Sequence, residues 1–300
     1  MSEQIALKPA KAMAPKTAHR RRRWLPFDRW HLFLFPFALV MLFPMLWMLV
    51  TSIETISEAR RFPPVMIPEG IHWVNYPNAL KRGAFGTYFL NTFIVTMATV
   101  IGNLVFCSLA GYAFARIKFF GREVVFMLML ATLMIPYQVT IIPEFLIVKW
   151  LGTHISPQIG IDSLGALIVP GLVQVFGIFL LRQFFRTLPI ELEEAARIDG
   201  ASRLGILFKI VLPLSLPALA TLGALTFLWT WNDFLWPLIA IMSPEHYTIQ
   251  LGLMNFQTAH TTSWTLLMAA NVMSMIPLLI VFLAAQKYFI QSVATSGLKG

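Results

Sequence analysis

Six long apolar runs, separated by more polar segments, dominate the pattern of hydrophobic and polar positions along the chain. A membrane-spanning helix needs about 20 mainly apolar residues to cross about 30 Å of hydrocarbon. The runs cover approximately residues 32–52, 87–113, 124–142, 164–184, 216–240 and 264–285. They predict an all-α membrane protein with six transmembrane helices in one domain, residues 32–285.

Prolines fall inside these runs or at their edges. Membrane helices tolerate proline where neighbouring groups satisfy the freed backbone groups. We therefore expect helices that bend around one another or around a cavity. The prolines are Pro36, Pro44, Pro136, Pro170, Pro237 and Pro277.

Composition supports the membrane interpretation. Hydrophobic residues make up 57% of the 300 residues and charged residues 12%, whereas a soluble chain carries about 25% charge. Such a chain is also too apolar to be disordered. The single cysteine, Cys107, lies in an apolar run and excludes both a disulfide framework and a cysteine metal cluster. No metal site is predicted.

The positive charge is concentrated at the N-terminus. Residues 1–31 hold eight of the 23 Lys and Arg residues and predict a disordered basic cytoplasmic arm that rests on anionic lipid, with no role in binding nucleic acid. The apolar run that follows, Leu32 to Val50, is longer than the 7–15-residue core of a signal peptide. We therefore expect an uncleaved first span.

Basic residues also set the orientation. Of the 23 Lys and Arg residues, 18 fall on the side of the N-terminus in a six-span topology and 5 on the other. Because Lys and Arg are in excess on the cytoplasmic side, both termini are predicted to be cytoplasmic. Residues 53–86, 143–163 and 241–263 then form outside loops, and residues 286–300 form a cytoplasmic tail.

The cytoplasmic segment 185–215 has the pattern of two short helices joined by a turn. Pro189 suits the first helical position, and the three glutamates after it suit the positive end of a helix. Gly200 suits the left-handed residue after a helix end. Ser202 can cap the second helix, and Pro213 is expected just beyond it.

The second helix of this segment has an apolar face. Leu204, Leu207 and Phe208 repeat at three and four residues, which places them on one side. A projecting helical segment with a polar tip and an apolar face could bind a peripheral partner protein. The alternative is an ordinary amphipathic surface loop.

A spaced motif runs through the same segment: Glu194-Ala195-Ala196, three residues, Gly200, nine residues, Ile210, one residue, Leu212-Pro213. This pattern resembles the coupling-loop motif of permease subunits of ATP-binding cassette (ABC) importers, with every defining position filled. Further stretches resemble permeases of carbohydrate importers, and the C-terminus resembles the tail of the second permease of the maltose type. These stretches are Met134–Val139 with Ile142-Pro143, Trp231–Phe234, and Tyr288–Gln291 with Gly297–Gly300.

The resemblance covers about residues 30–300 and implies a binding-protein-dependent importer with the type I ABC permease fold, in a prokaryotic cell (inner) membrane. The implied partners are a second permease in a heterodimer, two copies of a nucleotide-binding ATPase, an extracytoplasmic solute-binding protein, a sugar and membrane lipid. The chain itself has no phosphate loop of the form GxxxxGK[ST]. No enzyme activity and no bound cofactor are therefore expected of it, and ATP and Mg belong to the partner ATPase.

The resemblance also implies roles for individual residues. The coupling loop sits in a groove of the ATPase, where Gly200 sets the angle between the two helices. Glu194 and Asp199 make polar contacts, and Ala195 and Ala196 allow close approach. The tail, through Gln291, Gly297 and Lys299, also reaches the ATPases.

Polar residues at membrane depth are candidates for the substrate pathway. Thr92, Thr96, Thr99 and Asn103 share one helical face, which lines a wet path or else joins helices through hydrogen bonds worth ~0.6 kcal/mol each. Trp231, Asn232 and Asp233 could form a sugar site, or could anchor the outer end of a span as interfacial groups do.

Three alternatives to an importer of a neutral mono- or oligosaccharide remain. A polyol phosphate such as glycerol phosphate would require cationic groups on the pathway. A stand-alone secondary transporter would require embedded ion-binding groups, of which Asp233 is the strong candidate, and leaves the coupling motif unexplained. A membrane scaffold would tolerate changes at Thr99, Asn103 or Asp233 without loss of uptake.

Overall fold

The computed structural model describes residues 30–257 and 262–296. This part of the chain is helical and contains no β-strand, only an isolated bridge between Gln257 and Thr262. The chain divides into two compact units, residues 1–45 and 46–300, and the boundary lies within the first helix.

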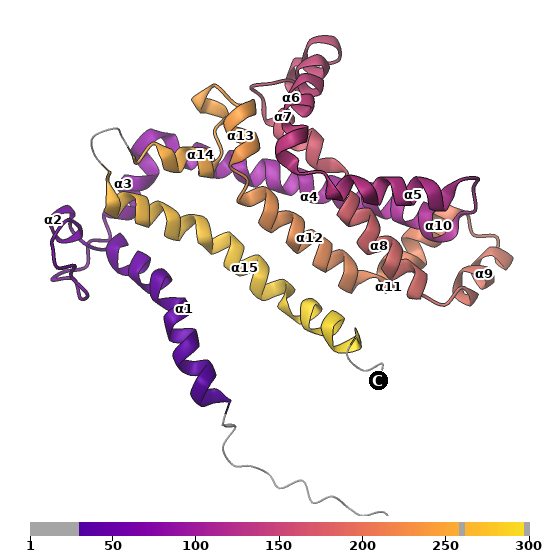
Figure 1. The fold of residues 1–300 in the computed structure, drawn as a ribbon, viewed down its shortest axis with the longest axis horizontal. Helices are drawn as coiled ribbons and strands as arrows, with labels where there is room; N and C mark the ends of the chain where they lie inside the picture. Colours follow the sequence, from indigo (N-terminus) through magenta and orange to yellow (C-terminus); the bar gives the residue numbers. More distant parts are fainter. Residues whose placement is uncertain (1–29, 258–261, 297–300) are drawn as a thin grey trace, which may run out of the picture. The chain divides into compact units, whose positions relative to one another are not determined.

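The helices vary in length from single turns to more than eight turns (Figure 1). They are α1 His31–Ser52, α2 Ile56–Ala59, α3 Asn75–Lys81, α4 Phe85–Arg116, α5 Arg122–Ala131, α6 Tyr137–His154, α7 Leu164–Ile168, α8 Val175–Thr187, α9 Glu191–Ile198, α10 Arg203–Ile206, α11 Leu212–Leu214, α12 Leu216–Trp231, α13 Leu235–Ala240, α14 Ile249–Met254 and α15 Trp264–Ser296. Short 3-10 helices cover Arg82–Ala84, Thr132–Met134, Pro157–Ile159, Val169–Leu172 and Pro244–His246, and a π-helix covers Leu207–Val211.

All six predicted spans have a counterpart among the described residues. Four segments are long and apolar enough to cross a membrane: His31–Ser52, Phe85–Arg116, Leu164–Thr187 and Trp264–Tyr288. Two bent pairs complete the set, Arg122–Met134 with Tyr137–His154 and Arg203–Leu214 with Leu216–Trp231. Large apolar side chains on α1 and α5 are exposed, as expected of surfaces that face lipid.

The third predicted span is bent rather than straight. Its two helices meet at 108° around Pro136. Proline disfavours helical geometry in the residue before it, and Ile135 is extended, with φ −81° and ψ 120°. Beyond the bend α6 continues to His154, so residues 143–154, expected in an outside loop, are helical.

The fifth predicted span, 216–240, is interrupted. A bend of 81° near Ser215 separates it from the helical segment before it, and α12 ends at Trp231. Residues 232–234 lie between α12 and α13. Asn232 and Asp233 therefore lie at a helix break and not inside a continuous helix.

Helix α4 is the centre of the second unit and packs against α8 and α12, while α12 also packs against α15. Gly111 allows the close approach of α8, because a Cβ there would lie 3.1 Å from the Leu181 Cβ. At Gly177 a Cβ would lie 2.8 Å from the sulfur of Cys107, which is fully buried. Cys107 is thus a small core residue.

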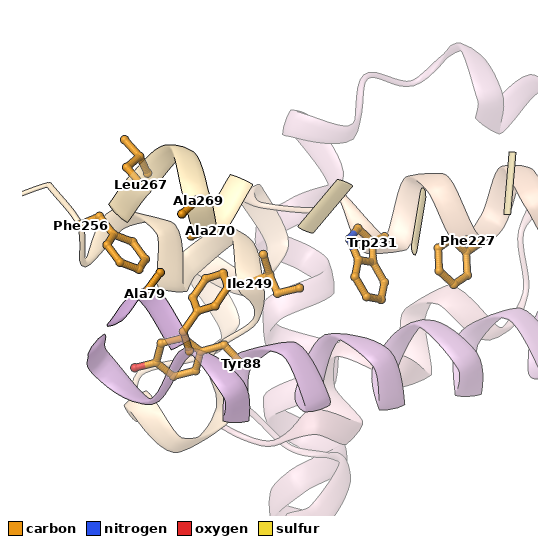
Figure 2. Close-up of a cluster of buried hydrophobic side chains, with 10 residues drawn as sticks. Ala79, Tyr88, Phe227, Trp231, Ile249, Phe256, Leu267, Ala269 and Ala270 are labelled. Carbon is orange, nitrogen blue, oxygen red and sulfur yellow. The ribbon is translucent and has the colours of Figure 1, made fainter. Parts of the chain in front are cut away.

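One buried cluster joins α4, α12, α14 and α15 (Figure 2). Trp231 and Phe227 point from α12 toward α4, with ring centroids 5.3 Å apart. The indole N–H of Trp231 donates to the Ser274 carbonyl at 3.0 Å. The ring is therefore fixed on both its apolar face and its polar edge.

Helices α8 and α5 are joined by a buried arginine. The Nη2 of Arg182 lies 2.7 Å from the Glu123 carboxylate. Its guanidinium also covers the ring of Phe126, with the central carbon 3.8 Å from the ring centroid. Arg182 thus combines an ion pair with a cation–π contact.

Candidate functional site

Helix α9 begins in an acidic turn, as the sequence predicts. Glu191, Glu193 and Glu194 lie in its first turn, where negative charge complements the helix dipole. The helix begins at Glu191, so Pro189 precedes it by two residues instead of occupying the first helical position.

The turn after α9 is a Schellman motif. Gly200 has φ +81°, its N–H donates to the Arg197 carbonyl at 3.0 Å, and the Ala201 N–H donates to the Ala196 carbonyl at 2.9 Å. These are the two bonds that close a helix through a left-handed residue. Ser202 then caps α10, its hydroxyl accepting from the Gly205 N–H at 3.1 Å. The predicted turn chemistry at both residues is confirmed.

The second helix of the loop differs from expectation in two ways. It continues from α10 through the π-helix into α11, so Pro213 lies within it and not after it. Proline supplies no N–H to the helical ladder, and a wider π turn accommodates that loss. The predicted apolar face is also divided: Leu207 is buried, whereas Leu204 and Phe208 are exposed.

The residues of the coupling motif separate by polarity. Glu194, Ala195, Asp199 and Gly200 are exposed at the tip of the loop. Ala196, Ile210 and Leu212 pack partly against the buried cluster of α4, α8 and α12, and Pro213 is exposed. The outer side therefore offers carboxylates and small residues, while the inner side holds the loop on the helices.

A cavity of about 1100 Å³ lies where α4, α6, α7, α12 and α13 converge. Thr99, Asn232 and Asp233, three of the predicted pathway residues, line it. Its other lining residues are Tyr137, Glu144, Leu167, Pro170, Gly171, Gln174, Leu228, Trp229, Thr230 and Trp236.

The other three predicted pathway residues lie outside this lining. Thr96 is fully buried, and Trp231 belongs to the core cluster of Figure 2. Asn103 donates to the Gly171 carbonyl at 3.2 Å and accepts from the Thr226 hydroxyl at 3.4 Å. Asn103 thus joins helices, which is the second of the two roles considered for the polar face of α4.

Glu144 was not among the predicted pathway residues, because residues 143–163 were predicted to form an outside loop. Helix α6 brings this carboxylate close enough to Tyr137 and Asp233 for electrostatic interaction. Among the described residues, the lining thus has two carboxylates and no Lys or Arg. The sequence signal that could have identified Glu144 is a single glutamate within the apolar run after Pro136.

On the predicted outer side, Asp162 connects two loops. Its Oδ1 accepts from the Met242 and Ser243 backbone N–H groups at 2.9 and 2.8 Å, and its Oδ2 accepts from the Ser243 hydroxyl at 2.5 Å. Burial disfavours the charged form, but these hydrogen bonds and the nearby His246 outweigh burial and lower the pKa of Asp162.

Helical spans, an exposed loop with an acidic tip and a cavity lined by aromatic and polar residues are the features of a membrane permease. Residues 107–295 match the family model described as binding-protein-dependent transport system inner membrane component, and the chain belongs to that family. The family resemblance and the predicted fold class are confirmed.

Relatives support a sugar importer. The arabinooligosaccharides transport system permease protein AraQ of Halalkalibacterium halodurans is 35% identical and covers 88% of this chain and 93% of its own length. The sn-glycerol-3-phosphate transport system permease protein UgpE of Pectobacterium atrosepticum is 34% identical, with coverage of 89% and 95%. The chain is therefore a permease of the sugar ABC importer class.

A solved structure shows the same fold. A chain of a bacterial ABC transporter involved in the import of the acidic polysaccharide alginate aligns with a TM-score of 0.76 at 27% identity. The alignment covers 88% of this chain and 99% of that chain.

Proposed function

We propose that this chain and a second permease subunit enclose the translocation path of an importer for a neutral saccharide in a prokaryotic inner membrane. Two copies of a partner ATPase bind ATP and Mg, and an extracytoplasmic binding protein delivers the sugar. The observation that carries the coupling role is the exposed, acidic tip of α9 with its fixed turn at Gly200.

The coupling step is a rigid-body movement. Glu194 and Asp199 present carboxylates to a basic groove of the ATPase, and the small side chain of Ala195 allows close contact. Gly200 holds the angle between α9 and α10. The tail adds a second contact: Gln291 belongs to α15, while Gly297 and Lys299 lie outside the described residues.

The cavity supports a neutral cargo. Trp229 provides an exposed ring for a sugar face, and Asn232, Asp233 and Glu144 accept hydrogen bonds from hydroxyl groups. A phosphate or uronate 4 Å from one of these carboxylates meets a repulsion of about 1–4 kcal/mol, depending on hydration. The carboxylates therefore favour a saccharide over the polyol phosphate that the UgpE relative transports by its name.

The test uses the complex isolated from native membranes through a tag on this chain and placed in lipid nanodiscs. ATP hydrolysis is followed while neutral sugars, uronates and glycerol phosphate are added with the co-expressed binding protein. We expect an ATPase to co-purify and a neutral sugar to raise its rate. The absence of an ATPase after gentle crosslinking contradicts the importer, and stimulation by glycerol phosphate alone contradicts the neutral cargo.

Two variants test the sites separately. Glu194→Lys should leave the protein inserted but uncouple hydrolysis from uptake, because its charge no longer fits a basic groove. Asp233→Asn should reduce uptake of the neutral sugar. Glu69, an exposed glutamate in the predicted outer loop, provides matched controls as Glu69→Lys and Glu69→Gln, and both should behave like the unmodified protein.

A further inference from the structure

Glu193 differs from the two other glutamates in the first turn of α9. Only 2% of Glu193 is exposed to solvent, whereas Glu191 and Glu194 are exposed. Consecutive helical residues point about 100° apart. The turn that offers Glu194 to the outside therefore directs Glu193 into the body of the protein.

Residues at the C-terminal end of α4 contact both carboxylate oxygens of Glu193. The Arg116 Nε lies 2.7 Å from its Oε1 as a buried ion pair, and the Tyr112 hydroxyl donates to its Oε2 at 3.1 Å. Arg116 also donates to the Leu188 carbonyl at 2.7 Å. The end of α4 thus holds both α9 and the backbone before it.

Helix α4 connects this contact with the cavity. Thr99 lines the cavity, and Arg116 lies 17 residues further along the same helix, about 25 Å away at 1.5 Å per residue. A displacement of α9 is therefore delivered to α4 through the hydrogen bond of Tyr112 and the ion pair of Arg116.

Resting on the proposed function, we infer that Glu193 is a positioning residue for coupling. It makes α9 and α4 move as one body, so that movement at the ATPase side reaches the cavity. A buried ion pair is a poor source of net stability compared with apolar packing. The ion pair instead sets the orientation of α9 relative to α4, because Arg116 and Tyr112 fix the rotation of α9 about its axis.

The test compares coupling with stability in the assembled transporter in nanodiscs. Glu193→Ala leaves the buried guanidinium of Arg116 without its partner and carries a risk of misfolding. The decisive variant is therefore Arg116→Met with Glu193→Leu, which removes both charges. Glu193→Gln keeps an acceptor for Tyr112 and provides a conservative rescue, and Glu191→Gln is the matched exposed control.

We expect the double variant to assemble with its ATPases, while stimulation of hydrolysis by sugar and binding protein falls about five-fold or more, the lower end of usual coupling between sites. Glu193→Gln should fall between the double and unmodified proteins, and Glu191→Gln should match the unmodified protein. Hydrogen exchange of the α9 amides should accelerate in the double variant while that of α8 is unchanged.

Two outcomes separate this inference from the proposed function. If the unmodified complex shows no sugar-dependent hydrolysis, the proposed function fails. The hydrogen exchange of the α9 amides still tests whether Arg116 and Glu193 hold α9 on α4. If the unmodified complex is stimulated and the double variant is stimulated equally, with unchanged exchange in α9, the positioning role of Glu193 is refuted.

Discussion

Gly200 permits a clean test of the coupling loop. Its φ is +81°, and a Cβ added there would meet no atom within 4 Å. A substitution therefore introduces backbone strain without a steric clash. Because the Schellman hydrogen bonds at Arg197 and Ala196 require this left-handed residue, the strain acts directly on the turn between α9 and α10.

The magnitude follows from the cost of the left-handed conformation. An alanine there costs about 1–2 kcal/mol relative to glycine, which lowers the equilibrium constant between the native turn and its open forms by about 5–30-fold at 1.4 kcal/mol per factor of ten. If the ATPase binds only the native turn, its apparent affinity falls by up to this factor, because affinity follows the fraction of chains with the native turn. Asparagine tolerates this conformation better than alanine, and valine tolerates it worse.

The assay measures the affinity of the purified ATPase for the permease in nanodiscs. We expect affinity to decrease in the order glycine, asparagine, alanine, valine at position 200. The control is Gly121→Ala, because Gly121 has φ +74° and equally open space around its Cβ but lies outside the coupling loop. The reasoning fails if Gly200→Ala binds as tightly as the unmodified chain, or if Gly121→Ala weakens binding as much.

Three further predictions concern the body of the protein. Arg182→Met should lower stability by about 1–3 kcal/mol, because the ion pair and the contact with Phe126 are lost, seen as a lower unfolding temperature in nanodiscs. Gly252→Ala should cost about 1–3 kcal/mol in the same assay, because its Cβ overlaps the ring of Tyr88. Asp162 should make the outer loops pH-dependent: its pKa is lowered in the folded state, so its stabilisation is present above about pH 3.9 and is lost as the pH falls toward the lowered value.

Matched variants separate these causes from general damage. Arg186→Met changes an exposed arginine of α8, and Gly86→Ala adds a Cβ that meets no atom within 4 Å. Both should leave the unfolding temperature unchanged, and an equal loss would contradict the local explanations. The asparagine of Asp162→Asn tolerates φ +64°. This variant should abolish the acid-induced rise in amide hydrogen exchange of the outer loops that Asp162 joins. A rise that persists in this variant assigns the effect to another group.

Local chemistry made much of the coupling loop predictable. The acidic first turn of α9, the left-handed Gly200 and the cap at Ser202 each depend on a few neighbouring residues. The coupling motif required no tertiary information, because it is defined by spacing along one segment. The continuation of the second helix past Pro213 was missed, because a proline alone does not distinguish the end of a helix from a local π turn.

Apolar length and the distribution of Lys and Arg alone determined the six spans, their predicted orientation and the membrane class, because the thickness of the bilayer and the cost of burying charge act on every segment separately. The site depended on contacts between distant segments. Only the tertiary structure separated Thr99, at the cavity, from Asn103, between helices. It also brought Glu144 toward Asp233 and Arg116 to Glu193. Spacing along a helix gives the face of a residue but not its neighbour, and the neighbour decides whether a polar group lines a path, joins helices or holds the coupling loop.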